Sequence, residues 1–511
     1  MARKLRLILG DQLNYQHSWF QETDSQVVYL LMEMKQELTY VKHHIQKVVG
    51  FFKAMRAFKE WLESEGHEVI YYSLDHKKNK QSLTDNLSKL IEEESITTFE
   101  YLLPDEYRLD EQLKDFCDHL SIDSDSYDTE HFLTERSGVA NFFKKKKTYL
   151  MENFYRMMRK KYDLLMEDEE PIGEQWNYDE ENRNKYKGKV PVPDIPSFEH
   201  DVQGIIDLLD EQDIATIGQI DAKRFSYPTS REEACALLKH FTTECLPHFG
   251  TYEDAMHTDH PYLFHSRLSF ALNTKMLHPL EVCKAAIETW EADKDTITLA
   301  QVEGFVRQII GWREFMRGIY WEKMPDYKEK NYFSHEAPLP DFYWTGNTKM
   351  NCLSHAITQS LENAYAHHIQ RLMLTGNFAL LLGVHPDEVD QWYLGIYIDA
   401  IEWVEITNTR GMSQFADGGL IATKPYVSSA NYIHKMSNYC KDCSYDYKSK
   451  YGEKACPFNS LYWDFLHRHQ DQLGNNGRMG MMYSMLKKMD EEERDKILAQ
   501  AAKYKEKVND L

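Results

Sequence analysis

The first 135 residues alternate between short apolar runs and longer amphipathic segments, and this alternation constrains the fold more than any other feature. The apolar runs are LRLILG, QVVYLLM, HEVIYYSL, FEYLLP and TEHFLT, and segments with helical periodicity separate them. Strands that alternate with helices form parallel sheets joined by right-handed crossovers. Residues 1–135 are therefore predicted to form a Rossmann-like, doubly wound α/β domain, although no G-x-G-x-x-G turn follows the first run.

The character of the chain changes after residue 135. Basic helical segments lead into EDEEPIGEQWNYDEENRNKYKGKVPVPDIPSFEH, whose prolines, glycines and mixed charges indicate a long loop. Residues 136–201 are thus predicted to be a basic helix and an interdomain linker. From residue 202 to 511 apolar residues recur at a spacing of three to four, which predicts an all-helical domain.

The charge balance limits the partners that the chain can have. Its 511 residues include 60 basic and 82 acidic side chains, giving a formal net charge of −22. This excess of acidic residues argues against a surface that is positive throughout and binds nucleic acid non-specifically. The clusters FFKKKKTY and RMMRKKY can still form a local basic patch or a solvated helix face. Because no run approaches ~20 apolar residues, we expect a cytoplasmic protein with reduced thiols and no membrane contact.

Three of the eight cysteines lie within 17 residues, in NYCKDCSYDYKSKYGEKACPFN. Cys440 and Cys443 have the C-x2-C spacing that lets two thiolates approach one soft metal centre, and Cys456 follows as Cys-Pro. A site with four thiolate ligands needs one more cysteine than these three, and Cys352 is the best candidate for the fourth. The alternative is that these cysteines are buried small hydrophobic residues, which is what we expect of Cys117, Cys235, Cys245 and Cys283.

The order of domains and four local motifs resemble the photolyase and cryptochrome superfamily. YLFHSRLSFALNTKMLHP resembles the flavin-phosphate segment of that superfamily, and GWREFMR matches its W-R-E-F. YAHHIQRLM resembles W-M-H-N-R-x-R-M, and WYLGIYIDAIEWVEITN resembles the flavin-cradling stretch that follows. The resemblance covers essentially the whole chain. It implies an N-terminal antenna domain, a long loop and a C-terminal helical FAD-binding domain.

The four cysteines narrow the resemblance to the iron–sulfur bacterial cryptochromes and photolyases, also called prokaryotic (6-4) photolyases. In that group a 4Fe–4S cluster lies beside FAD, and the resemblance implies that Cys352, Cys440, Cys443 and Cys456 hold it. The cluster would then tie a distal helical segment onto the flavin domain.

The resemblance also implies how FAD is held. HSRLS supplies hydroxyl and backbone donors for the diphosphate, two arginines meet charge on the cofactor, and Asp399 lies against the isoalloxazine. Glu405 stands where DNA photolyases keep an asparagine near flavin N5, although an ordinary exposed glutamate is the alternative. The implied FAD-binding residues are His265, Ser266, Ser269, Arg313, Arg371, Asp399 and Glu405.

The reaction implied is light-driven repair of (6-4) pyrimidine–pyrimidone photoproducts, in which excited FADH⁻ donates an electron to the lesion. A group must move between the two rings, and this step requires proton transfer. His368 stands where (6-4) photolyases keep a catalytic histidine. Eukaryotic relatives have a second histidine four residues later, where this chain has Leu372. Trp392, Tyr393 and Trp344 resemble the aromatic residues that conduct electrons to the flavin.

The antenna chromophore of this group is 6,7-dimethyl-8-ribityllumazine. Ligands of parallel sheets bind at the carboxyl ends of the strands. Side chains after the first two predicted strands are therefore the candidates for that pocket: Asp11, Gln12, Glu33 and Glu37.

Ultraviolet-damaged DNA must present a flipped lesion, because stacked bases cannot reach a buried flavin. Lysines and arginines of the two basic clusters, together with an adjacent tryptophan, are the candidates for backbone contact. Acidic groups near the DNA make stimulation by Mg²⁺ plausible. The candidate DNA-binding residues are Lys144, Lys145, Lys146, Lys147, Arg156, Arg159, Lys160, Lys161 and Trp176.

Two other functions compete with repair. A blue-light receptor, or cryptochrome, would use the same fold and cofactors with a regulatory output, but His368 and the lack of a low-complexity C-terminal tail favour repair. An iron–sulfur DNA-binding module similar to that of large primase subunits would carry no flavin. A monomer is expected in each case.

Overall fold

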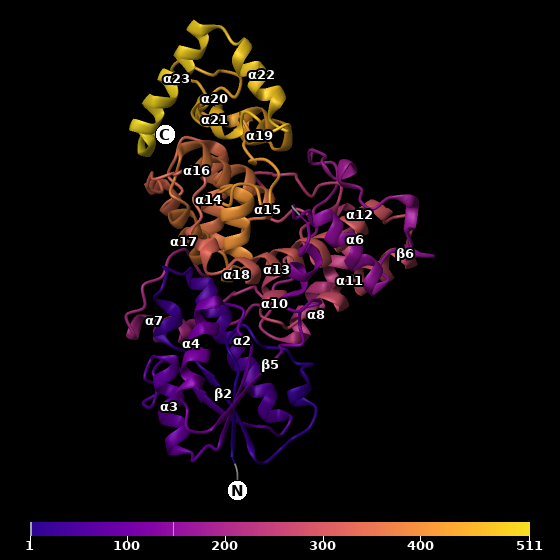
Figure 1. Ribbon diagram of the computed structural model, residues 1–511, viewed down its shortest axis with the longest axis vertical. Helices are drawn as coiled ribbons and strands as arrows, with labels where there is room; N and C mark the ends of the chain where they lie inside the picture. Colours follow the sequence, from indigo (N-terminus) through magenta and orange to yellow (C-terminus); the bar gives the residue numbers. More distant parts are fainter. Residues whose placement is uncertain (1–2, 147) are drawn as a thin grey trace.

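The computed structural model describes residues 3–146 and 148–511. Figure 1 shows the α/β part at one end of an elongated molecule, a middle body of helices, and the last helices at the opposite end. The fold class predicted from the sequence, α/β followed by all-α, is confirmed. Within the described residues, no helix is both long and apolar enough to cross a membrane.

Five parallel strands form the sheet of the N-terminal domain, in the order β3-β2-β1-β4-β5. Leu5 and Val28 lie side by side in the register of β1 with β2, and Leu5 also pairs with Phe99 of β4. These three side chains are fully buried, as expected of central strands covered on both faces. The strands are β1 (Lys4–Leu7), β2 (Val27–Met32), β3 (Glu68–Tyr72), β4 (Thr98–Leu102) and β5 (Asp123–Tyr127).

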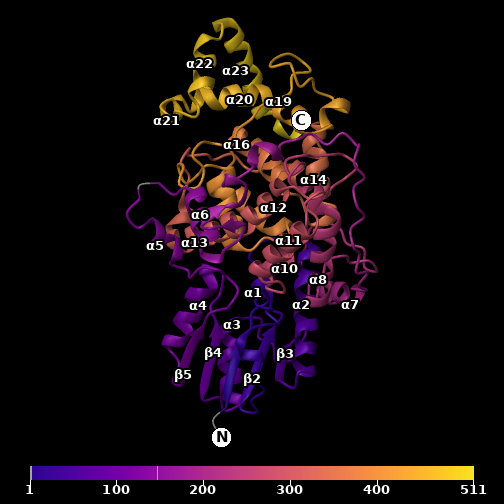
Figure 2. The ribbon, with the colours of Figure 1, turned by 90° about the vertical axis from the view of Figure 1, so that its right-hand side faces the viewer.

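Helices cover both faces of this sheet (Figure 2). One face packs against leucines of α3 (Leu83–Glu93) and α4 (Tyr107–Asp118), and the other packs against α2 (Ile45–Ser64). The short α1 (Lys35–Leu38) and η1 (Ser18–Phe20) complete the domain. The alternation of strands and helices in the sequence therefore arises from a three-layer domain.

The fifth strand was predicted at the wrong place. TEHFLT (129–134) is not a strand, and β5 is the preceding DSDSY, an edge strand that pairs only with β4 and is largely exposed. An exposed edge strand needs no apolar run, so periodicity missed it. Residues 129–134 instead cross to the helical domain, where the backbone N–H groups of Leu133 and Thr134 donate to the buried Glu314 carboxylate, each at 3.1 Å.

The segment between sheet and helical body begins with α5 (Gly138–Phe143) and α6 (Met151–Tyr162) and includes a two-stranded hairpin, β6 (Met166–Glu167) with β7 (Glu170–Pro171). Long irregular stretches follow up to α7 (Gln203–Glu211). The middle body then contains α8 (Arg231–His240), η4 (Phe241–Cys245), α9 (Leu246–Phe249), α10 (Ser269–Asn273), α11 (Pro279–Ala292), α12 (Leu299–Val306), η5 (Arg307–Arg313) and α13 (Glu314–Lys323).

The remaining helices form the rest of the body and its far end (Figure 1). The body continues with α14 (Asn351–Asn363), α15 (His368–Gln370), η8 (Arg371–Gly376), α16 (Asn377–Leu382), α17 (Pro386–Ile396), α18 (Glu402–Ile406) and η9 (Thr407–Ser413). The far end contains α19 (Ala430–Met436), η10 (Tyr439–Asp442), α20 (Pro457–Arg468), α21 (Gln470–Leu473), α22 (Gly480–Lys488) and α23 (Glu491–Glu506).

The start of α2 joins the α/β domain to the helical body. The Lys47 ammonium donates to the carbonyl oxygens of Leu394 and Ala400, each at 2.7 Å, and the His44 N–H donates to the Gly395 carbonyl at 2.8 Å. A Cβ atom at Gly395 would lie 2.3 Å from the Lys42 carbonyl oxygen. The two domains therefore meet backbone to backbone at this glycine.

We predict that Gly395→Ala lowers the free energy of unfolding by about 2 kcal/mol, because the added methyl group overpacks this contact. Gly204→Ala is the matched control, since Gly204 is also in a helix but has open space around its Cβ position. Chemical denaturation measures both variants. Equal stability of Gly395→Ala and wild type would contradict the close contact.

Candidate functional site

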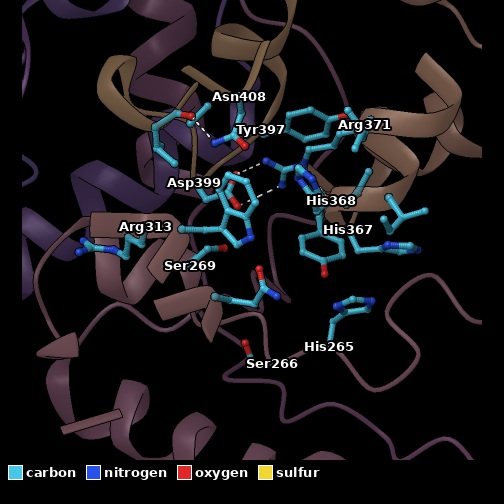
Figure 3. Close-up of a pocket in the computed structure, with 18 of the residues that line it drawn as sticks. His265, Ser266, Ser269, Arg313, His367, His368, Arg371, Tyr397, Asp399 and Asn408 are labelled. Atoms are coloured by element: carbon cyan, nitrogen blue, oxygen red, sulfur yellow. Dashed lines mark hydrogen bonds and ion pairs between the residues drawn. The ribbon is translucent and has the colours of Figure 1, made fainter. Parts of the chain in front are cut away.

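A cavity of about 330 Å³ opens within the helical body. Figure 3 shows side chains from several separate helices and loops converging on it. All seven predicted flavin residues, far apart in the sequence, lie on its wall together: His265, Ser266, Ser269, Arg313, Arg371, Asp399 and Glu405. Concave sites with a few convergent polar groups are the usual form of cofactor pockets.

Three π-helical turns line this cavity: η5, η8 and η9. They carry Arg313, Arg371 and Thr409 respectively. A π turn widens the helix by one residue and is frequently found at functional sites. The local widening lets these side chains reach the cavity from helices that are otherwise buried.

A two-point ion pair between Arg371 and Asp399 crosses the cavity wall (Figure 3). Nη1 and Nη2 of Arg371 lie 3.0 and 3.1 Å from the two carboxylate oxygens, and the guanidinium stacks 3.8 Å from the centre of the Tyr397 ring. The Asn273 amide donates to the Asp399 carbonyl at 2.7 Å. A planar guanidinium that is both paired and stacked has a fixed position.

Arg313 is buried on another side of the cavity. Its guanidinium lies 4.7 Å from the Phe132 ring centre and 5.0 Å from that of Trp403, and one nitrogen is 2.9 Å from His131 Nε2. Burial lowers the pKa of Arg313 to about 10. Its Nη1 lies 3.5 Å from the Glu314 carboxylate in an ion pair, and its Nε has no hydrogen-bond partner within the described chain, so Nε is the donor left for an anionic ligand.

Two histidine rings stack at the cavity. The rings of His265 and His367 are 4.5 Å apart and nearly parallel, and Nε2 of each is buried with no hydrogen-bond partner among the residues that the structure describes. Next to them, His368 presents its side chain to the open cavity. The surrounding protein and the nearby Arg371 lower the pKa of His368 to about 4, so its imidazole is neutral near pH 7.

The carboxyl group of Glu405 also lines the cavity and is buried. Burial, and then the neighbouring Asp390 carboxylate, raise the pKa of Glu405 well above its ordinary value. Within the described part of the chain, its Oε1 is buried without a hydrogen-bond partner. The alternative interpretation of Glu405 as an exposed surface residue is therefore wrong.

An aromatic row leads away from the cavity. Tyr393 and Tyr397 line it, and the fully buried Trp392 contacts both, at ring distances of 5.2 and 5.8 Å. Trp392 also contacts Tyr343 at 5.3 Å, whose neighbour Trp344 is 38% exposed. No sequence pattern marks Tyr343 and Tyr397, because isolated tyrosines resemble ordinary core residues.

Comparison with known proteins identifies the protein family to which this chain belongs. Residues 6–225 match the family described as deoxyribodipyrimidine photo-lyase-related protein. The chain is 43% identical over 509 residues to a (6-4) photolyase from Agrobacterium fabrum, and the match covers 99% of this chain and 100% of that protein. The chain belongs to the prokaryotic (6-4) photolyase family. The family inferred from the sequence motifs is thus confirmed.

Two solved structures share the fold of this photolyase-family chain. A bacterial class III photolyase from Agrobacterium tumefaciens superposes with a TM-score of 0.55 at 15% identity, covering 96% of this chain and 98% of its own. A Synechocystis cryptochrome superposes with a TM-score of 0.53 at 11% identity, covering 93% and 94%. At such identities the likeness concerns the fold, and it agrees with the predicted architecture.

A second cavity of about 140 Å³ lies at the carboxyl ends of the strands, against Ala400 and Ile401 of the helical body. Three of the four predicted antenna residues of this family member line it, and each is already paired: Asp11 with Lys275, Glu33 with Arg56 and Glu37 with Arg108. The prediction for Gln12 is wrong. Its amide is buried in the turn after β1, where it bonds to the backbone of Leu9 and Leu102.

Two cavity residues in the α/β domain were not predicted. Lys47 and Glu106 line the second cavity, on α2 and just before α4. Neither follows the first two strands, so the strand-end rule did not select them. Burial lowers the pKa of Lys47 to about 8, and burial with the nearby Glu402 raises the pKa of Glu106 to about 8.

The four predicted cluster cysteines line one small cavity at the far end of the helical body. Cys352 lies on α14, Cys440 on η10, and Cys456 precedes α20. Burial and the neighbouring sulfurs raise the pKa of the Cys352 thiol well above its ordinary value. Among the described residues no three His, Cys, Asp or Glu side chains are close enough to share a single metal ion.

The predicted DNA residues separate into exposed and buried ones. Lys144, Lys145 and Lys146 are exposed, and Lys147 lies outside the described residues. Arg159 is fully buried and donates to the carbonyls of Leu164 and Trp176, so its prediction as a DNA contact is wrong. Arg159 stabilises the fold around the Trp176 ring, over which its guanidinium lies. The guanidinium of Arg156 and the ammonium of Lys160 lie over the same ring. Lys161 is exposed.

Glu106 predicts a pH dependence of stability. Its folded pKa of about 8 exceeds the unfolded value, so the folded chain holds a proton that the unfolded chain has lost. Its contribution therefore becomes less favourable as pH rises from the unfolded pKa towards 8. We expect ligand-free Glu106→Gln to lose less stability than wild type between pH 5 and pH 8 in denaturant titrations.

The control is Glu288→Gln, whose carboxylate is exposed on α11. It should keep the wild-type slope of stability against pH. Parallel slopes for Glu106→Gln and wild type would show that Glu106 is ionised in the folded chain. The other charged groups that act on Glu106 are Glu402, Arg108, Glu37 and Asp11.

Proposed function

We propose that this protein repairs (6-4) photoproducts in DNA by light-driven electron transfer from reduced FAD, acting as a (6-4) DNA photolyase. The observation that carries the proposal is that His368 and the Arg371–Asp399 pair face the same cavity. The relative that is 43% identical over the whole chain is itself named a (6-4) photolyase. A cryptochrome would use the same cavity, but its regulatory function does not require an imidazole that can contact a DNA lesion.

The residues of the main cavity fit FAD. Among the described residues, Arg313 Nε and Glu405 Oε1 have no hydrogen-bond partner, and Ser266 and Ser269 lie on the cavity wall. We propose that the serines and His265 hold the diphosphate side and that Arg371, Asp399 and Glu405 meet the isoalloxazine. When bound, reduced FAD supplies the electron that repair requires. Because Arg371 is ion-paired and stacked, the isoalloxazine side of the site is already fixed before photoexcitation.

His368 is proposed as the residue that exchanges a proton with the lesion. Its pKa of about 4 in the free chain leaves it neutral, with one ring N–H to donate. An anionic cofactor and DNA phosphates would raise that pKa, because nearby negative charge favours the imidazolium. Proton donation by His368 is therefore coupled to occupation of the site.

We propose that Tyr393, Trp392 and Trp344 conduct electrons from the surface to the flavin, with Tyr343 and Tyr397 completing the row. Trp344 is the exposed end of this row and Tyr393 its cavity end. The ring centre of Trp392 lies 5.2 Å from that of Tyr393 and 5.3 Å from that of Tyr343, which supports the buried part of this path, and Trp344 follows Tyr343 in the chain.

The second cavity is the proposed site of 6,7-dimethyl-8-ribityllumazine. Its wall combines apolar residues such as Phe51 and Met55 with the polar edge formed by Asp11, Glu37, Lys47 and Glu106. An apolar wall suits a flat ring, and a polar edge suits ribityl hydroxyl groups.

A 4Fe–4S cluster bound by Cys352, Cys440, Cys443 and Cys456 is proposed for the third cavity. The four thiols line one small space, and four cysteine thiolates are the usual ligands of a 4Fe–4S cluster. Such a cluster would connect α14, η10 and α20. Raised thiol pKa values indicate that the thiols need a metal to become thiolates.

Damaged DNA is the proposed partner, held by Lys144, Lys145, Lys146, Arg156, Lys160, Lys161 and Trp176. Against a net charge of −22, these contacts should give binding that weakens strongly with salt. Mg²⁺ would assist by screening acidic side chains near the duplex.

We predict that His368→Ala binds FAD and photoreduces normally but loses at least about 100-fold in (6-4) repair, since general acid catalysis has gone. His467→Ala, an exposed histidine on α20, should repair like wild type. The assay follows reversal of a defined (6-4) oligonucleotide under blue light, with a cyclobutane-dimer oligonucleotide alongside. Normal photoreduction without repair of either lesion by wild type would favour the cryptochrome function.

The cluster proposal predicts that Cys440→Ala together with Cys456→Ala abolishes bound iron and sulfide and lowers the melting temperature. Cys235→Ala, which removes a solitary half-buried thiol on α8, should retain both. Iron and sulfide analysis of the purified proteins checks this. Full iron content in the double variant would assign the iron to other ligands.

A further inference from the structure

A chain of polar groups leads from the main cavity towards the surface behind Glu405. The Thr409 hydroxyl donates to the Asp390 carboxylate, which lies on the neighbouring helix α17. The same hydroxyl is also within hydrogen-bonding reach of the Glu405 carboxyl group, whose pKa it acts to lower. Thr409 lines the cavity beside Glu405, and Asp390 lies behind both. One hydroxyl thus stands between two buried carboxyl groups.

Asp390 connects this pair to the solvent. Its other oxygen accepts from Arg410, and Arg410 also pairs with Asp387. The Asp387 side chain is 53% exposed, and Asp390 keeps 13% of its own side chain exposed. Arg410 holds the two aspartates but carries no proton between them, because a guanidinium stays charged. Asp390 is therefore the group that can exchange a proton with water.

Burial favours a proton within this pair. It raises the pKa of Asp390 to about 6 and raises the pKa of Glu405 well above its ordinary value, so each carboxyl group holds a proton more readily than a free side chain does. Two carboxyl groups that interact closely titrate as a pair and can share one proton. The charged groups that face them from the packed elements are Arg410, Asp387, Glu402 and Lys47.

We propose that Asp390 and Thr409 form a proton relay that resupplies Glu405 whenever Glu405 gives its proton to the cofactor in the main cavity. The inference rests on the proposed function in one respect, the presence of FAD in that cavity. It adds two residues, Asp390 and Thr409, that act on Glu405 and do not touch the cofactor themselves.

The step balances in protons and electrons. Reduction of oxidised flavin to FADH⁻ takes two electrons, here from an external thiol, and one proton. Glu405 releases that proton and becomes a carboxylate. Asp390 takes up a proton from the solvent and passes it to the Thr409 oxygen, while the Thr409 hydroxyl hydrogen passes to the Glu405 carboxylate, so that Asp390 and Thr409 end as they began. No covalent bond other than O–H is made or broken in the protein.

Thr409 also has a simpler role, because its hydroxyl contacts the Glu405 carbonyl one turn back at 3.1 Å. Thr407, two residues earlier on the same π turn, has that role alone: its hydroxyl donates to the Trp403 carbonyl at 2.9 Å, and the side chain is fully buried. Thr407→Val is therefore the matched control for Thr409→Val. Each change removes one buried hydroxyl from one helix.

The test uses the full-length, FAD-loaded protein with a thiol reductant. A laser flash starts photoreduction, loss of flavin absorbance reports electron arrival, and a pH-indicator dye reports proton uptake from solvent. We expect Thr409→Val and Asp390→Asn to slow proton uptake about tenfold or more while electron arrival is unchanged. Thr407→Val and Thr409→Ser should take up protons at the wild-type rate.

A second measurement covers variants that retain little FAD. In flavin-free protein, the infrared carboxyl band that disappears in Glu405→Gln reports Glu405, and its shift after transfer to D₂O reports exchange. Thr409→Val and Asp390→Asn should slow that shift. Unchanged proton uptake or unchanged exchange in both variants would overturn the relay. Wild-type protein that binds no FAD would instead overturn the proposed function.

Discussion

The buried ion pair between Arg371 and Asp399 is the interaction on which the site depends. Arg371 comes from a π turn, Asp399 from the loop after α17, and the two hydrogen bonds between them fix the cavity wall. The Asp399 carbonyl also accepts from Asn273 on α10, so this one residue ties three segments together. Removing one partner of such a buried pair typically costs about 3–5 kcal/mol, because it leaves an unpaired charge.

The same loop joins the helical body to the α/β domain. Ala400 follows Asp399, and its carbonyl accepts from Lys47, whose side chain lines the second cavity. Ala400 itself lines both cavities. An antenna in the second cavity and a flavin in the first would therefore be separated by little more than one backbone segment. The α/β domain thus both supplies the proposed antenna site and supports the loop that carries Asp399.

The sequence predicted those features that depend on local pattern. Strand and helix alternation predicted the sheet, and the motifs around Ser269, Arg371 and Asp399 predicted residues that converge on one cavity. The errors share a physical cause. β5 is an exposed edge strand without apolar periodicity, and Gln12 and Arg159 satisfy buried carbonyls, which no linear pattern reveals. Lys47, Tyr343 and Thr409 were missed because their roles arise from contacts between distant segments.

The central claim is that the cavity beside Arg371 and Asp399 holds a flavin against which an extruded lesion meets His368. A crystal structure of the FAD-loaded protein with a (6-4) lesion duplex tests it most directly. We expect the isoalloxazine between Asp399 and Glu405, with the flipped lesion within hydrogen-bonding distance of the His368 ring. A flavin bound in another cavity, or a lesion held away from His368, would contradict it.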